Sequence, residues 1–380
     1  MDKNLARPAE ILRDVWTTLM SDILPFLKSI ISVSGLSGHE TPVANLIQQK
    51  WTPLVDELTQ SKLGSIHGLK KGRRTTGIRS ADKSPRPSVL IATHMDAIGL
   101  MVSRIVEGFV YVTNIGGVDS RVLPGSPVLV HASSGEELYG VVVMPPANLL
   151  PDGEGSGAVA LKYLMVDTGL TPSEVSKRIK VGDRVSFNTE PVEMSGGCVS
   201  GHTLDNRASV AALTICLEEL QSKSHVWDVW ALASVQEEVT FGGAYTSTFE
   251  IRPTIAVAVD MTFGKGTGSS GYQTFAIGKG VTLGISPSIH PFLYKRFKEV
   301  AERNEIPVSD DMMPEYSSTD ADAMQLVAEG IPTMVLSIPQ RYMHTPVELV
   351  SIKDIQRAGR LLAEFIASLE ADFIEKIIWE

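Results

Sequence analysis

The spacing of apolar residues along the chain predicts helices that alternate with buried strands. Apolar residues recur at helical intervals in five segments: 9–33, 39–59, 207–222, 291–304 and 351 onward. Continuous apolar runs predict strands buried on both faces at 88–93, 229–235, 254–259 and 333–338. The last helix is expected to open with a capping box, because Ser351 is followed three residues later by Asp354. This pattern predicts one large α/β domain.

A different pattern interrupts this domain between residues 100 and 199. Short β-rich runs separated by Gly and Pro turns occur there, at 109–113, 127–131, 138–143 and 184–187. One helix is expected among them, around residues 173–179. The pattern favours a small β-barrel or sandwich. We therefore expect a discontinuous α/β domain, 1–99 and 200–380, with a β domain inserted at 100–199.

Composition narrows the classes of partner and compartment. The chain of 380 residues has a formal net charge of −10, which argues against nucleic acid or an anionic membrane as the main partner. No apolar run approaches the roughly 20 residues that a membrane span needs. The N-terminus lacks a signal-peptide layout, and the two cysteines, Cys198 and Cys216, form no CxxC pair. We expect a cytoplasmic protein. Residues 66–88 are basic and predict an exposed loop or hairpin.

Polar residues of one kind follow the predicted buried strands. At these strand ends, or just before the helix at 207–222, stand the residues His94, Asp96, Asp205, Glu237, Glu238, Asp260 and His344. Open α/β sheets bind ligands at the carboxyl ends of their strands, so these side chains are expected to converge. Taken singly, Asp205 and Asp260 also fit helix caps or turns, and a capping role suffices for Asp320 and Asp322. The joint pattern is what favours a site.

The residue types favour a metal centre. Imidazoles combined with carboxylates suit zinc, cobalt or manganese rather than calcium. Asp96 is placed to accept the second N–H of a metal-bound His94. On a strand, Glu237 and Glu238 would point to opposite faces, so that one holds metal and the other takes a proton from a metal-bound water. Two metals about 3.5–4 Å apart would use five ligands, with one carboxylate bridging.

These residues lie in segments that together resemble the M42 family of metallo-aminopeptidases. The matching segments are 94–102 (HMDAIGLMV), 115–125 (IGGVDSRVLPG), 204–213 (LDNRASVAAL), 235–239 (VQEEV), 256–262 (AVAVDMT), 318–322 (STDAD) and 342–346 (YMHTP). The likeness covers the chain from about residue 25. Two departures are Ala97, where the family usually carries Glu, and 240–243 (TFGG), where it often has Gly-Leu-Arg-Gly.

The resemblance implies a role for each candidate residue. Asp205 would bridge two divalent metal ions, zinc or cobalt first and manganese as an alternative. His94 and Asp260 would complete one metal site, and Glu238 and His344 the other. Glu237 would be the general base and later the proton donor to the leaving amine.

The resemblance also implies the fold, the reaction and the assembly. The fold would be a three-layer α/β/α zinc-peptidase domain whose inserted β domain serves oligomerisation and substrate access. Asp96 would orient His94. The reaction would be removal of N-terminal residues from peptides with free N-termini, by attack of a metal-bridging water. Family members commonly form hollow twelve-subunit tetrahedra, so self-association is expected.

Two other functions fit the sequence less well. A glycoside hydrolase would need two carboxylates about 5–9.5 Å apart across the scissile bond, whereas Glu237 and Glu238 are neighbours and the histidines would have no task. A non-catalytic metal-binding scaffold would be expected to lack a ligand or the base, and none is missing. The sequence fixes neither the native metal nor the preferred N-terminal residue.

Overall fold

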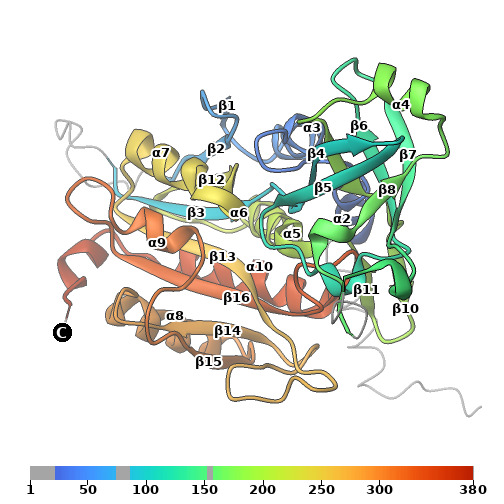
Figure 1. Ribbon diagram of the computed structural model, residues 1–380. Coiled ribbons are helices and arrows are strands. Elements are labelled where there is room, and N and C mark those ends of the chain that lie inside the picture. Colours follow the sequence, from blue (N-terminus) through green and yellow to red (C-terminus); the bar gives the residue numbers. More distant parts are fainter. Residues whose placement is uncertain (1–21, 74–85, 152–156, 380) are drawn as a thin grey trace, which may run out of the picture.

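A large mixed sheet with helices on both faces forms the centre of the molecule, and a small barrel lies to one side of it (Figure 1). The structure is a computed structural model and describes residues 22–73, 86–151 and 157–379. Much of the predicted helix at 9–33, and most of the basic stretch at 66–88, lie outside these residues. The α/β class with a β-barrel is confirmed.

In the described part of the chain, the large sheet has eleven strands in the order β1-β2-β12-β3-β13-β16-β17-β11-β10, with β14 and β15 attached through β16. Their bounds are β1 Glu57–Gln60, β2 Ile66–Lys70, β3 Ser88–His94, β10 Val192–Met194, β11 Cys198–Gly201, β12 Asp228–Ser234, β13 Ile255–Phe263, β14 Val281–Ile285, β15 Val308–Met312, β16 Thr333–Arg341 and β17 Glu348–Ser351. The four central strands β12, β3, β13 and β16 are mutually parallel. Their carboxyl ends therefore lie along one edge, as the continuous apolar runs predict.

Helices cover both faces of this sheet. They are α2 Leu24–Ile31, α3 Thr41–Trp51, α5 Leu204–Glu219, α6 Glu237–Thr240, α7 Gly242–Ile251, α8 Pro291–Arg303, α9 Asp320–Met324 and α10 Ile352–Ala367. In Figure 1, α9 lies in front of the sheet and α10 behind it. α10 packs against α5 and β16, and α9 packs against β13 and β16. The α10 face toward the sheet is apolar, with Leu362, Phe365 and Ile366 fully buried.

The barrel closes in the order β4-β5-β8-β7-β6-β9. Its elements are β4 Gly99–Val106, β5 Phe109–Ile115, β6 Pro127–His131, β7 Glu137–Val143, β8 Met165–Asp167, β9 Arg184–Phe187 and the helix α4 Pro172–Arg178. α4 begins with a capping box between Thr171 and Glu174. The barrel has its own apolar core, separate from that of the large sheet. The strands β10 and β11, which follow it in the chain, pair with the large sheet instead.

Two local predictions differ from the structure. The helix predicted over 39–59 ends at Trp51, because Pro53 cannot continue a helix, and residues 57–60 form β1. α10 begins at the predicted place, but the Ser351 side chain makes no capping bond. Asp354 instead accepts hydrogen bonds from the backbone N–H groups of Gly278 and Gly280 at 2.5 and 3.0 Å. Within the described residues, no helix is long and apolar enough to cross a bilayer.

Candidate metal centre

The candidate residues meet at the carboxyl edge of the four parallel strands. His94 is the last residue of β3, and Asp260 lies on β13. Glu237 and Glu238 open α6, which is separated from the end of β12 by the two residues Val235 and Gln236. His344 follows β16, and Asp205 lies in the first turn of α5. The structure therefore brings together all seven residues singled out in the sequence, including Asp96.

The first group of potential ligands surrounds the His94 ring. Its Nε2 atom lies 3.3 Å from Asp205 Oδ1 and 3.8 Å from Asp260 Oδ1. His94 is 1% exposed, and both carboxylates are buried. One ligand atom from each of these three residues fits within 4.8 Å of the others, a spacing that can hold a metal ion. The three residues come from three different elements, β3, α5 and β13.

The second group surrounds the His344 ring. Its Nε2 atom lies 3.6 Å from Asp205 Oδ2 and 3.5 Å from Glu238 Oε2. These three residues also have ligand atoms within 4.8 Å of one another. Asp205 thus belongs to both groups and presents one oxygen to each of them. A third possible set, His94 with Glu237 and Glu238, overlaps the other two.

Asp96 contacts residues of both groups although it does not belong to either. Its Oδ1 atom lies 3.4 Å from His94 Nδ1 and accepts the backbone N–H of Glu237 at 3.0 Å. Its Oδ2 atom accepts the N–H of Glu238 at 3.3 Å and the Ser37 hydroxyl at 2.6 Å. Burial would raise the pKa of Asp96, but the His94 and Ser37 contacts outweigh it and lower this pKa. Asp96 is fully buried and contacts the His94 ring and the backbone of both glutamates.

The two adjacent glutamates are separated differently from what the sequence predicted. They do not continue the strand, because Gln236 adopts a left-handed conformation and α6 starts directly after it. Successive residues on a helix point about 100° apart rather than to opposite faces. Glu237 Oε2 lies 3.7 Å from His94 Nε2, whereas Glu238 Oε2 faces His344. The helix turn therefore directs the two carboxylates toward different groups.

The crowding of carboxylates shows that metal ions fit this donor set. Burial raises the pKa of Glu237, Glu238 and Asp260 well above their ordinary values, and repulsion between neighbouring carboxylates adds to the effect. Burial lowers the pKa of His94, but Glu237, Asp205 and Asp96 outweigh it, so this pKa lies well above its ordinary value. The buried Oε1 atom of Glu238 has no hydrogen-bond partner among the described residues. Bound cations would compensate this negative charge.

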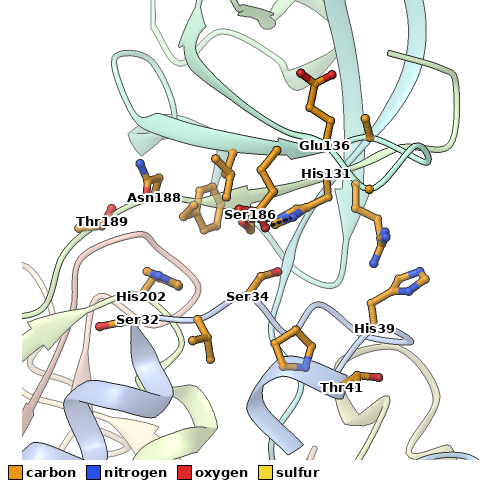
Figure 2. A pocket seen from close by; sticks show the side chains of 18 of the residues that line it. Ser32, Ser34, His39, Thr41, His131, Glu136, Ser186, Asn188, Thr189 and His202 are labelled. Atoms are coloured by element: carbon orange, nitrogen blue, oxygen red, sulfur yellow. Dashed lines mark hydrogen bonds and ion pairs between the residues drawn. The ribbon is translucent and has the colours of Figure 1, made fainter. Parts of the chain in front are cut away.

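A cavity of about 560 Å³ opens onto both groups. A second cavity of about 460 Å³ lies between the α2–α3 region and the barrel (Figure 2). Three histidines line it, but His131 is engaged by a 2.8 Å hydrogen bond between its Nε2 atom and the Ser186 hydroxyl. None of the three ligand clusters found in the described residues includes a residue that lines this second cavity. The chemistry is therefore expected at the carboxyl edge of the sheet.

The structure adds a residue that sequence reasoning missed. Glu348, at the start of β17, is 1% exposed. Its two carboxylate oxygens accept the backbone N–H groups of Asp205 and His344, each at 3.0 Å. Glu348 therefore holds the shared ligand and a ligand of the second group in register. Its position four residues after His344 does not indicate this role in the sequence, because its contact with Asp205 joins two residues that are 143 positions apart in the chain.

Replacing Glu348 with glutamine is expected to weaken metal binding by about 10–100-fold, the range found for partners that orient metal ligands. The amide keeps the size of the side chain but has only one acceptor oxygen, so one of the two backbone N–H bonds is lost. Chelator competition measures the affinity. The exposed Glu329→Gln variant is the control and should bind metal as the parent does. Unchanged affinity in Glu348→Gln would contradict the orienting role.

Two further buried residues support the site. Arg207 is fully buried and donates to the backbone oxygens of Met95 at 3.1 Å and Val33 at 2.7 Å, which fixes the segment after His94. For Asp320 the sequence suggested a capping role. The cap of α9 is instead the side chain of Thr319. Asp320 accepts the Ser234 hydroxyl at 2.5 Å, and burial raises its pKa to about 6. Both residues stand within motifs noted in the sequence.

The comparisons with known proteins agree with this geometry. The family model for M42 glutamyl aminopeptidase matches residues 76–361. The chain belongs to the M42 peptidase family. It is therefore a peptide hydrolase.

Similar proteins cover nearly the whole length of this M42 chain. It is 32% identical over 349 residues to a lysyl aminopeptidase from Pyrococcus furiosus, covering 90% of this chain and 96% of that protein. A TET aminopeptidase from a marine sediment Thaumarchaeota archaeon superposes with a TM-score of 0.86 at 28% identity, covering 94% of this chain and all of the other. A Pyrococcus horikoshii TET1 peptidase, described as assembling into a tetrahedron or a large octahedral shell, gives a TM-score of 0.77 at 25% identity, covering 92% of this chain and all of the other.

Proposed function

We propose that this protein is an aminopeptidase that uses two divalent metal ions to remove the N-terminal residue of peptides with a free N-terminus. The observation that carries the proposal is the sharing of Asp205 between two ligand groups, with Oδ1 toward His94 and Oδ2 toward His344. A carboxylate that faces both groups would let them hold two ions side by side, which would polarise the scissile carbonyl and activate the attacking water. Family membership supports peptide hydrolysis independently of this geometry.

His94, Asp205 and Asp260 would hold one ion, and Asp205, Glu238 and His344 the other. The donor set of imidazoles and carboxylates suits zinc or cobalt, with manganese as an alternative. When bound, such ions polarise the scissile carbonyl and make the attacking water more acidic. These six donor positions, with Asp205 counted twice, leave Glu237 free for proton transfer.

Glu237 is assigned as general base. Its carboxylate faces the cavity beside His94, is 8% exposed and is held in place through its backbone N–H by Asp96. It takes a proton from the attacking water and returns it to the leaving amine. In this proposal the free amino group of the substrate binds beside Glu238 and His344. That placement confines cleavage to the first peptide bond.

The test is release of free amino acid from unblocked and N-acetylated aminoacyl-amides and short peptides, with zinc, cobalt or manganese and with chelator. Metal-dependent release only from free N-termini is the expected result. Equal release from acetylated substrates, or release that persists in chelator, would contradict the proposal.

The glycoside hydrolase alternative finds no support in the geometry. Glu237 and Glu238 have carboxylate oxygens within 4.8 Å of each other and start the same short helix. Glycosidases place their two carboxyl groups on opposite sides of the bond, at about 5–9.5 Å. The two histidine-centred groups would also have no role in that reaction.

We further propose that twelve subunits assemble in the cytoplasm into a hollow particle. The tetrahedral assembly described for the Pyrococcus horikoshii relative supports the first part, and the absence of a CxxC pair is compatible with the second. Light scattering on the purified protein should give a mass about twelve times the 41.1 kDa of the chain. A monomeric mass would contradict this assembly.

A further inference from the structure

The cavity at the candidate metal centre continues into an apolar region with one buried carboxylate. Its walls beyond the ligand groups include Met261, Phe263, Met312 and Met313. Methionine side chains adapt their shape to flexible aliphatic groups. Asp311 lines the same cavity and is only 4% exposed.

Asp311 has an unused acceptor. Its Oδ2 atom accepts the hydroxyls of Thr262 at 2.7 Å and Thr282 at 3.3 Å. No described residue donates a hydrogen bond to its Oδ1 atom, and none forms a salt bridge with it. Burial raises the pKa of Asp311, although the two hydroxyls oppose this effect. A buried carboxylate of this kind is costly unless a cation pairs with it.

The neighbouring residue Asp310 shows the contrast. It points to the other side of β15, as successive strand residues do, and is exposed. Its carboxylate is paired with Lys298 at 3.2 Å and with the Tyr294 hydroxyl at 2.7 Å. No lysine or arginine lines the cavity within the part of the chain that the structure describes. A cationic group that enters the cavity therefore meets no lysine or arginine that competes for Asp311.

The position of Asp311 suits the first side chain of a bound peptide. Its partner Thr262 lies two residues after the candidate ligand Asp260 on β13, on the same face of the strand. Two residues along a strand cover about 6.5 Å. Asp311, which contacts Thr262, therefore lies about one such strand step beyond the candidate ligand Asp260, and lysine carries its charge at the end of a four-carbon stem.

We propose that this cavity selects peptides whose N-terminal residue is lysine or arginine, with Asp311 pairing the terminal cation. The proposal rests on the aminopeptidase function above. The aliphatic stem lies against the methionine walls, which long cationic side chains do readily. An N-terminal glutamate finds no lysine or arginine among the described residues of the cavity and meets the Asp311 carboxylate instead. Acidic N-termini are therefore poor substrates despite the glutamyl name of the family model.

The test compares lysyl-, arginyl-, leucyl- and glutamyl-amides with the metal-loaded enzyme. The parent should prefer lysyl and arginyl over glutamyl substrates by at least about 100-fold in kcat/KM, because the latter lose a charge-assisted bond and gain repulsion. Asp311→Asn should lower kcat/KM for lysyl and arginyl substrates by about 10–100-fold, mainly through KM. Its kcat/KM for the leucyl substrate should stay within about two-fold of the parent.

Asp310→Asn is the matched control, since it makes the same change one residue away on the opposite side of the strand. It should leave every kcat/KM unchanged. An Asp311→Asn variant that loses lysyl and leucyl activity equally would overturn the pairing role, as would a parent that prefers glutamyl substrates. If the parent releases no amino acid from any free N-terminus, the proposed function itself fails. Leucyl release without a basic preference would overturn only this inference.

Discussion

The Glu237→Gln variant is expected to lose about 10²–10⁴-fold in kcat while it binds the same amount of metal as the parent. A positioned general base contributes a factor of this size, and the amide cannot accept the proton. Glu237 is not needed for either of the two groups that share Asp205, so its replacement leaves both complete. The backbone bond from Glu237 N–H to Asp96 is also unaffected by the change. Steady-state kinetics with one peptide substrate measures turnover, and elemental analysis measures the metal content. The two effects are thus measured separately.

The adjacent glutamate provides the control for this result. Glu238→Gln makes the same chemical change one residue later but removes a ligand that lies 3.5 Å from His344 Nε2. This variant should lose metal, whereas Glu237→Gln should not. Full activity of Glu237→Gln would contradict its role as base, and loss of metal from it would move Glu237 into the ligand set.

The Asp205→Asn variant is expected to bind at most one metal ion per subunit and to lose more than about 100-fold in activity. Partners that only orient a ligand already account for 10–100-fold, and Asp205 is itself the shared candidate ligand. An amide keeps the shape of the side chain but offers one oxygen, so one of the two groups loses its donor. Metal content and kcat/KM, measured on the same preparation, test both parts.

Asp260→Asn is the comparison for this second prediction. Asp260 belongs to only one of the two groups that share Asp205, so its change should leave the Glu238 and His344 group complete. The Asp205 variant should therefore lose more metal, and lose it at lower chelator concentrations. Two bound ions and normal activity in Asp205→Asn would show that Asp205 does not bridge.

The gathering of the candidate residues could be predicted because it depends on a simple property of the sheet. Continuous apolar runs specify parallel strands buried on both faces, and parallel strands end at one edge. His94 and Asp260 on two of those strands were thus expected to meet. The residues that orient them were harder to predict from the sequence, because Glu348 and Arg207 act through contacts with backbone groups far away in the chain.

Local conformation limited the prediction at other points. The strand reading of Glu237 and Glu238 was wrong because Gln236 turns the chain into a helix through a left-handed conformation. The capping box at Ser351 was wrong because Asp354 finds backbone donors at Gly278 and Gly280, which only the folded chain brings near. Asp311 carried no signal either. It lies in a short strand whose other residues are exposed or half-buried, and the hydroxyls that contact it come from β13 and β14.

The most direct test of a two-metal aminopeptidase is titration of metal into chelator-treated protein, with bound metal and amino acid release measured at each step. The two groups around Asp205 predict that each subunit binds two zinc or cobalt ions. Activity is expected to reach its maximum as the second ion binds. Full activity at one ion per subunit, or activity that needs no added metal, would contradict the account.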